Sequence, residues 1–157
     1  MRLRHSLSLA FRKKLKCIIL IDKRIKHPPL FMANIIQREV FIMEYRRFGN
    51  TIYLRLDPKE EILEEIGKVA KKENIRLAQV TGLGAINDFT AGVYNTVTKE
   101  YHSIQFQGAF EIVSLTGTVT RKDGDVYLHL HIAAGDEKGH VHGGHLNRAI
   151  ISATAEI

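Results

Sequence analysis

The sequence has little of the chemistry that cross-links extracellular proteins or anchors proteins in membranes. It contains one cysteine, Cys17, three prolines and no tryptophan among 157 residues. A single cysteine excludes an intrachain disulfide and a cysteine-based zinc site, and it is compatible with the reducing cytoplasm, where we expect the protein. The longest apolar run of the N-terminal third, residues 17–21, is far shorter than the ~20 residues of a membrane-spanning helix, so we expect no membrane association.

The net charge of +6 is distributed unevenly along the chain. Residues 1–42 carry ten Lys and Arg against two acidic residues, whereas residues 43–157 carry 13 basic and 15 acidic residues. A surface that follows nucleic-acid phosphates needs clustered positive charge, and the longer segment has no excess of it. We expect residues 1–42 to be a basic extension outside the fold, from a start codon assigned too early, and residues 43–157 to form one domain.

The domain begins with a strand, a helix and a second strand. Residues 51–56 alternate between polar and apolar side chains, as a half-buried strand does. Asp57, Pro58 and Glu60 then offer an N-cap, a first-turn proline and a capping-box glutamate, which predicts a helix ending near Asn74. A buried strand over residues 75–81 follows.

The glycines after this strand, Gly82 and Gly84, predict a tight turn. A pair of glycines after a strand can also form a phosphate-binding loop, which is the alternative. This pair lacks the spacing and the following helix of a nucleotide-binding motif.

From residue 88 onward the pattern has a period of two, which predicts antiparallel strands. Lys122-Asp-Gly124 is typical of a hairpin turn. Five strands are expected, over residues 89–96, 100–106, 110–120, 125–133 and 149–157. One helix followed by five strands predicts an α+β domain with a mainly antiparallel sheet and a packed helix. The sequence stops inside the last strand, so we expect the domain to be truncated at its C-terminus.

Histidine is concentrated near the C-terminus, where five of the eight histidines lie between Val126 and Leu146. His129 and His131 are two residues apart in a predicted strand, so their side chains project from one face. His145 follows Gly143 and Gly144, which we expect to form a turn that returns it over that face. Three imidazoles without a fourth protein ligand are typical of an open zinc or related transition-metal site. The alternative is a half-buried polar stripe on a strand.

The two remaining histidines of this stretch, His140 and His142, have a simpler explanation. They lie at the end of a polar loop over residues 135–139 and just beyond it, where solvated histidines need no ligand role. A cupin-like site is not favoured, because no glutamate follows His131 within its strand and Glu137 lies in the loop.

Four motifs, in order and at suitable spacing, resemble the plants-and-prokaryotes-conserved (PPC) domain family. They are residues 110–119 (Phe-Glu-Ile-Val-Ser-Leu-Thr-Gly-Thr-Val), 128–131 (Leu-His-Leu-His), 143–146 (Gly-Gly-His-Leu) and 154–157 (Thr-Ala-Glu-Ile). The resemblance runs from about Tyr45 to the end. It implies an α+β subunit that assembles as a homotrimer, with zinc or another divalent transition metal at His129, His131 and His145. It also implies action through protein association, with transcription factors or DNA-associated proteins as partners.

Two departures from the plant members of the family count against direct DNA binding. The sequence has no Arg-Gly-Arg-Pro core of an AT-hook, although residues 11–16 are basic. The plant Gly-Arg-Phe-Glu-Ile segment, linked to partner binding, reads Gly-Ala-Phe-Glu-Ile at residues 108–112. The candidate pocket or partner-binding residues are Gly82, Gly84, Gly108, Phe110, Glu111, Gly143 and Gly144.

The histidine stretch also resembles acetolactate decarboxylase, a zinc enzyme that holds its metal with His-x-His and a later histidine. This implies an alternative function, a zinc-dependent lyase acting on a small oxo- or hydroxy-acid. Such an enzyme needs charged groups to orient its substrate, and the candidates are Glu111, Glu156, Arg46, Arg47 and Arg55. A second alternative is a protein that binds DNA directly.

Overall fold

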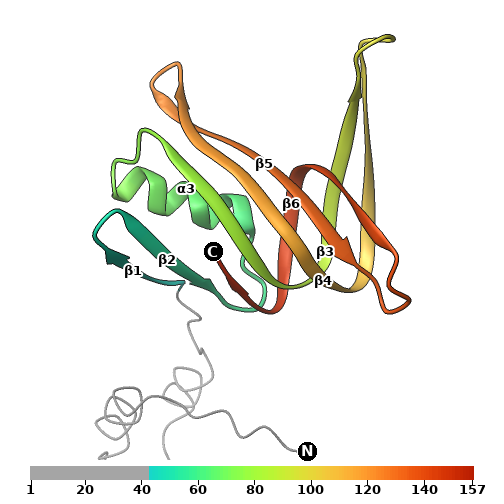
Figure 1. Ribbon diagram of the computed structural model, residues 1–157, viewed down its shortest axis with the longest axis horizontal. Helices are drawn as coiled ribbons and strands as arrows, with labels where there is room; N and C mark the ends of the chain where they lie inside the picture. The colour runs from blue at the N-terminus through green and yellow to red at the C-terminus, as the bar shows by residue number, and fades with distance from the viewer. Residues whose placement is uncertain (1–42) are drawn as a thin grey trace, which may run out of the picture. The chain divides into compact units, whose positions relative to one another are not determined.

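The computed structural model describes residues 43–157 (Figure 1). The elements in chain order are β1 (Glu44–Phe48), β2 (Thr51–Leu56), α3 (Ile62–Lys72), β3 (Ala78–Asn95), β4 (Glu100–Lys122), β5 (Asp125–Gly135) and β6 (Val141–Glu156). Every strand pairing is antiparallel. The prediction of a mainly antiparallel sheet with one packed helix is confirmed. The predictions for residues 1–42 lie outside the described residues.

Four of the strands form a closed ring. The sheet order is β1-β2-β6-β3-β4-β5, and β5 also pairs with β6. The pairing of residues 131–135 with residues 141–145 therefore joins the two ends of the β6-β3-β4-β5 series. The β1–β2 hairpin lies outside the ring and pairs with β6 only at Arg55 with Glu156 and Leu56 with Ala155.

Helix α3 covers the inner face of the sheet with one apolar stripe. Ile62, Ile66, Val69 and Ala70 are buried at the i, i+4, i+7 and i+8 spacing that the sequence predicted. They pack in one core with buried strand residues that include Leu56, Ile86, Phe89, Leu115, Leu130 and Ile151. No helix within residues 43–157 is long and apolar enough to cross a bilayer.

The helix begins later than the sequence predicted. Its N-cap is Glu61, whose side chain accepts a hydrogen bond from the backbone N–H of Glu64. Lys59 has a φ of 79°, outside the helical region, so Asp57 cannot be the cap. The side chain of Glu60 still accepts from the N–H of Asp57, and the capping-box pair therefore closes a turn before the helix. The helix ends at Lys72, close to the predicted end.

The predicted turn at Gly82 and Gly84 is wrong. Strand β3 runs through both residues for 18 positions, with register shifts between Gly82 and Gly84 and between Ile86 and Asp88. Gly84 has a φ of 151°, and a Cβ atom there would lie 2.6 Å from the Cα atom of Ala155. The glycine permits a bend and a close approach of β6, and the strands predicted over residues 75–81 and 89–96 belong to one long strand.

Glycines also lie within β4 and β6. Gly108 joins the strands predicted over residues 100–106 and 110–120 into the single strand β4. Gly143 and Gly144 lie inside β6, so the turn predicted there is wrong and the last strand begins at Val141. The predicted hairpin turn at Asp123 and Gly124 is confirmed, with positive φ at both residues as a type I′ turn requires.

The far ends of β3 and β4 form a projecting hairpin. Pairing of β6 with β3 stops where Gly92 faces His145. Beyond this point β3 and β4 continue as a pair as far as Asn95 opposite Glu100. In Figure 1 this hairpin, drawn in yellow, extends away from the rest of the domain. A two-stranded hairpin is marginally stable in water by itself, so the apolar side chains that it exposes need cover.

Truncating the side chain of Phe89 should strongly destabilise the fold. This side chain is fully buried and stacks on Phe106 at a ring-centroid distance of 4.8 Å. Phe89→Ala should lower the free energy of unfolding by about 3–5 kcal/mol, because it removes buried surface and leaves a cavity. Urea denaturation of the variant and the unmodified protein measures the difference. The control is Val97→Ala at an 87% exposed position, which should change stability by less than about 0.5 kcal/mol. Equal effects at the two positions would contradict the described core.

Candidate metal centre

His129 and His131 lie on the outer face of β5. They alternate with Leu130 and Ile132, which are buried on the core side, so both imidazoles point away from the core. This is the shared face that their spacing predicted.

The third histidine reaches the same face by strand pairing. The Cα atoms of His131 and His145 are direct partners in the β5–β6 ladder. A Cβ atom at Gly144 would lie 2.5 Å from the carbonyl oxygen of Gly92, and one at Gly143 would collide with the carbonyl oxygen of Ile132. The two glycines thus act by letting β6 lie close against both β5 and β3.

The three imidazoles form one cluster. Their ring centroids are 5.4 Å apart for His129 and His131, 5.1 Å for His129 and His145, and 5.6 Å for His131 and His145. One ring nitrogen from each lies within 4.8 Å of the other two. Nitrogens bound at ~2.0–2.1 Å to one tetrahedral ion are about 3.4 Å apart, so small side-chain rotations would complete a zinc site. No other group of three potential ligands is as close within the described part of the chain.

The electrostatics of the cluster favour an uncharged His145. Burial lowers the pKa of His145, and the neighbouring imidazoles of His129 and His131 lower it further when they carry charge. A neutral imidazole keeps the lone pair that a metal ligand needs. The pKa of His145 is lower in the folded state than in the unfolded state. Its contribution to stability is therefore present above the ordinary imidazole pKa and is lost as the pH falls through the lower, folded-state pKa.

Thr116, Thr118 and Tyr101, which are uncharged, lie beside the three histidines. On β4, Thr118 is the Cα partner of His129 and Thr116 is the partner of His131. The ring of Tyr101 meets His145 edge-on at a centroid distance of 6.2 Å, and its hydroxyl donates to Oδ1 of Asn147 at 2.7 Å. His129 and His131 are exposed. A metal held here would keep a position open to solvent or to an external ligand.

Some neighbours of the three histidines could have been predicted from the sequence. A two-residue turn at Asp123 and Gly124 sets the β4–β5 register, and counting outward from it places Thr118 opposite His129. Tyr101 carries no such signal, because its approach depends on how β3, β4 and β6 come together.

His140 and His142 are not brought into the cluster. Both rings approach one carboxylate oxygen of Asp136, at 3.3 and 3.5 Å. Desolvation acts to raise the pKa of Asp136, but backbone hydrogen bonds from His140 and Lys138 and the two rings outweigh it and lower the pKa to about 2. The ring of His142 also packs on Phe106 at a centroid distance of 4.9 Å. These contacts give the pair a structural explanation within the β5–β6 loop.

The candidate pocket or partner-binding glycines and side chains are dispersed along the sheet. Gly82 and Gly84 lie where β3 meets the end of β6. Phe110 packs against Phe89 at a centroid distance of 5.2 Å, while Glu111 is exposed and pairs with Gly135. The cluster of His129, His131 and His145 includes none of the candidates Gly82, Gly84, Gly108, Phe110 and Glu111.

The charged candidates for a lyase site also lie elsewhere. Each of the three arginines forms an ion pair on or beside the β1–β2 hairpin: Arg46 with Glu44, Arg47 with Glu73 and Arg55 with Asp57. Glu156 lies at the opposite end of β6 from His145, and its carboxylate raises the pKa of the neighbouring Tyr53. Within this chain, none of them is placed to orient a substrate at the histidines.

Comparisons with known proteins identify both a family and a fold. The family model described as the Plants and Prokaryotes Conserved (PCC) domain matches residues 43–157. Among curated proteins, none matches the chain. A structure described as a "putative DNA-binding protein" of Bacteroides thetaiotaomicron is 32% identical, with a TM-score of 0.71, covering 73% of this chain and 80% of that one.

Two archaeal structures are similar as well. A plant- and prokaryote-conserved (PPC) protein of Pyrococcus horikoshii is 34% identical, with a TM-score of 0.63, covering 73% of this chain and 78% of that one. A protein of Archaeoglobus fulgidus described as metal-containing is 31% identical, with a TM-score of 0.63, covering 75% of this chain and 81% of that one.

The geometry of the cluster predicts that replacing one histidine removes the metal. His131→Ala should abolish stoichiometric zinc in protein purified at neutral pH, because two imidazoles cannot complete the site. Elemental analysis of the dialysed protein measures the zinc content. His140→Ala is the control and should leave most of the metal. Zinc should also dissociate as the pH falls, because protons then compete with the metal for the imidazole nitrogens. Stoichiometric zinc in the His131→Ala variant would contradict the prediction.

Proposed function

The chain belongs to the Plants and Prokaryotes Conserved (PCC, also written PPC) domain family, and we propose that it is a homotrimeric, metal-binding member that acts by associating with other proteins in the cytoplasm. The observation that carries the metal-binding part is the convergence of His129, His131 and His145 on one face. The observation that supports self-association is the exposed apolar surface of the β3–β4 hairpin.

Zinc is the proposed metal, with another divalent transition metal as the alternative. Imidazole nitrogens suit zinc, and the cluster offers three of them and no thiolate. The similar protein of Archaeoglobus fulgidus is described as metal-containing, which supports the assignment. Bound zinc would supply a Lewis acid with one free position. The three histidines would hold the ion, while Thr116, Thr118 and Tyr101 would offer neutral hydrogen-bonding groups beside it.

A binding role for the metal is better supported than a catalytic one. Hydrolytic and lyase chemistry needs a positioned acid or base in addition to the metal. The three histidines lie among threonine, tyrosine and glycine, and the carboxylates proposed from the sequence are placed elsewhere. The lyase function and the likeness to acetolactate decarboxylase remain predictions from the sequence.

Self-association would cover the projecting hairpin. Val93, Val97 and Ile104 are 64%, 87% and 61% exposed, and Tyr94 and Tyr101 also reach the surface. A pair of strands without a third is marginally stable in water, so contact with a neighbouring subunit would stabilise it. We therefore propose that this hairpin contributes to the trimer interface.

Association with transcription factors or DNA-associated proteins is the proposed biological role. The family membership and the structures described as putative DNA-binding proteins support it. Direct DNA binding by the domain is not proposed, because residues 43–157 hold more acidic than basic side chains and would release few counterions. The segment around Gly108, Phe110 and Glu111 is the candidate partner contact.

The proposed trimer is tested by its mass in solution. Multi-angle light scattering at micromolar concentration should give three times the 17.8 kDa chain. The paired change Val93→Lys and Ile104→Lys should shift the mass to one chain, because it places charge on the surface that a neighbour would cover. Val113→Lys, at a 63% exposed position outside the hairpin, is the matched control and should leave the trimer intact. A stable monomer before any substitution would contradict the proposal.

DNA affinity, where measured, should depend on residues 1–42. Deleting them removes ten of the 23 basic residues, so binding to duplex DNA should be abolished and its salt dependence should flatten. Fluorescence anisotropy over a series of salt concentrations measures both effects. Tight binding by residues 43–157 alone at physiological salt would instead support the direct DNA-binding alternative.

A further inference from the structure

The loop between β5 and β6 holds a second group of potential metal ligands. It consists of Asp136, His140 and His142, and we call it the loop triad. The sequence pattern favours solvated histidines here, but the structure brings both rings to one carboxylate oxygen, Oδ2 of Asp136. Nδ1 of His140 lies 3.3 Å from this oxygen, and Nε2 of His142 lies 3.5 Å from it. One carboxylate and two imidazoles form a donor set that binds divalent transition metals.

The two separations are long for hydrogen bonds and suit donors that share an ion. A hydrogen bond from a nitrogen to an ionised carboxylate is ordinarily about 2.7–2.9 Å long. Donors held at ~2.0–2.1 Å by one tetrahedral ion lie about 3.4 Å apart, which matches both distances from Oδ2. The two ring nitrogens must still approach each other, because the loop triad is less closely spaced than the histidine cluster. The side chain of His140 is 67% exposed and can make this rotation.

The other oxygen of Asp136 fixes the orientation of the carboxylate. Oδ1 accepts hydrogen bonds from the backbone N–H groups of Lys138 at 2.8 Å and of His140 at 2.9 Å. The backbone of the loop is also closed, because the N–H of Asp136 donates to the carbonyl oxygen of His140 at 2.9 Å. Oδ2 is therefore directed at the rings before any ion binds, as a ligand on a preorganised support.

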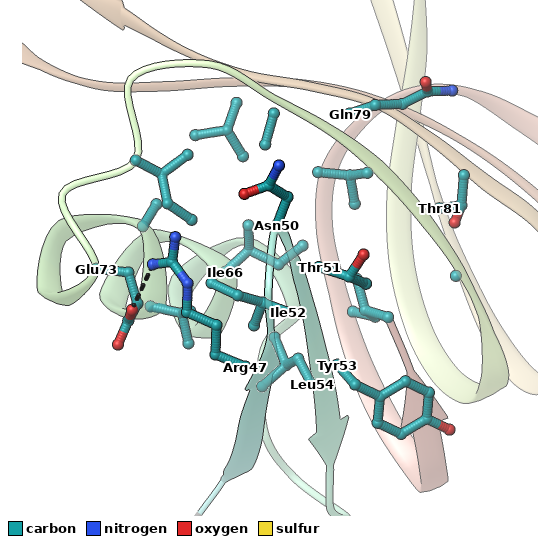
Figure 2. A pocket seen from close by; sticks show the side chains of 18 of the residues that line it. Arg47, Asn50, Thr51, Ile52, Tyr53, Leu54, Ile66, Glu73, Gln79 and Thr81 are labelled. Carbon is teal, nitrogen blue, oxygen red and sulfur yellow. Dashed lines mark hydrogen bonds and ion pairs between the residues drawn. The ribbon is translucent and has the colours of Figure 1, made fainter.

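Asp136 differs from the other shielded carboxylates in its partners. Four other carboxylates with side chains at most 22% exposed form ion pairs, and each pairs with an arginine or a lysine: Asp57 with Arg55, Glu65 with Lys68, Glu73 with Arg47 and Asp88 with Arg148. Figure 2 shows one of these pairs, Arg47 with Glu73. Asp136 is similarly shielded, at 23%, but its ion-pair partners within residues 43–157 are the two histidines. An imidazole carries no permanent charge, so a bound cation would supply the charge that this carboxylate lacks.

The loop triad is separate from the histidine cluster. His142 is the Cα partner of Ala134, which is fully buried, and its ring packs on Phe106 at a centroid distance of 4.9 Å. His145 lies three positions further along β6 and therefore faces the opposite side of the sheet. The backbone of the sheet lies between the two groups of ligands, so one ion cannot bind to both.

We propose that the loop triad is a second metal site, in which Oδ2 of Asp136, Nδ1 of His140 and Nε2 of His142 bind a divalent transition metal ion. It binds more weakly than the histidine cluster, because His140 must rotate and lose conformational freedom, and dialysis removes its ion. The ion cross-links the loop beside the pairing of Gly135 with Val141, and so stabilises the end of the β5–β6 ladder.

Zinc is the probe that tests this site, and isothermal titration calorimetry of the full chain counts the zinc equivalents and their affinities. Asp136→Asn and His140→Ala should each weaken one equivalent at least tenfold, because each removes a donor. His131→Ala should instead remove a tighter equivalent, so failure of the loop triad and failure of the histidine cluster are seen separately. Unchanged zinc binding in either Asp136→Asn or His140→Ala overturns the proposal.

Two matched controls test whether the effect is specific. Glu137→Gln changes the neighbouring exposed carboxylate of the same loop, and His102→Ala removes an exposed histidine that lies 3.5 Å from Glu100. Both should leave every zinc equivalent unchanged, and an equal loss in either control overturns the proposal. Thermal melting without zinc monitors the fold. His140→Ala replaces an exposed side chain, so it decides the outcome if Asp136→Asn does not fold.

Diffraction from the unmodified chain provides an independent check of the ligand atoms. Crystals soaked in zinc chloride should show an anomalous peak within bonding distance of Oδ2 of Asp136 and of the named nitrogens of His140 and His142. A peak at the histidine cluster without one at the loop triad, in crystals saturated with zinc, overturns the proposal.

Discussion

The pairing of β5 with β6 is the constraint on which the histidine cluster depends. It places His131 opposite His145 and closes β3, β4, β5 and β6 into a ring. Without this ladder, His129 and His131 would be two imidazoles on an exposed strand. Backbone hydrogen bonds and the core on the other face of the same strands hold the ladder in register, so the cluster is positioned before any metal binds.

Closure of the ring requires backbones to approach closely at several points, and glycine occupies those points. Gly144 allows β6 to lie against the carbonyl group of Gly92 of β3, and Gly84 of β3 allows Ala155 of β6 to approach closely. A Cβ atom at either position would overlap main-chain atoms, which cannot rotate away as a flexible side chain can. The same glycines therefore bend the long strands and bring together residues that lie far apart in the sequence.

The two ends of the sheet differ in how completely their backbone groups are paired. Around the ring each strand has neighbours on both sides, and this part presents the histidines. Toward the β1–β2 hairpin, β6 supplies only a short connection to β2. A rigid support suits metal ligands, because their nitrogen atoms must stay within a few tenths of an ångström of the positions that the ion requires.

The sequence by itself determined the local features whose signals are local. Alternation identified the antiparallel strands, the spacing of His129 and His131 placed them on one face, and Asp123 with Gly124 marked a hairpin whose register also places Thr118. The motifs at residues 110–119 and 143–146 identified the family. Only the tertiary structure decided that Gly82, Gly84, Gly143 and Gly144 lie within strands, that Glu61 caps the helix, and that Tyr101 lies beside His145. The physical reason is that a glycine fits a turn and a close strand crossing equally well, and the choice depends on partners that are distant in the chain.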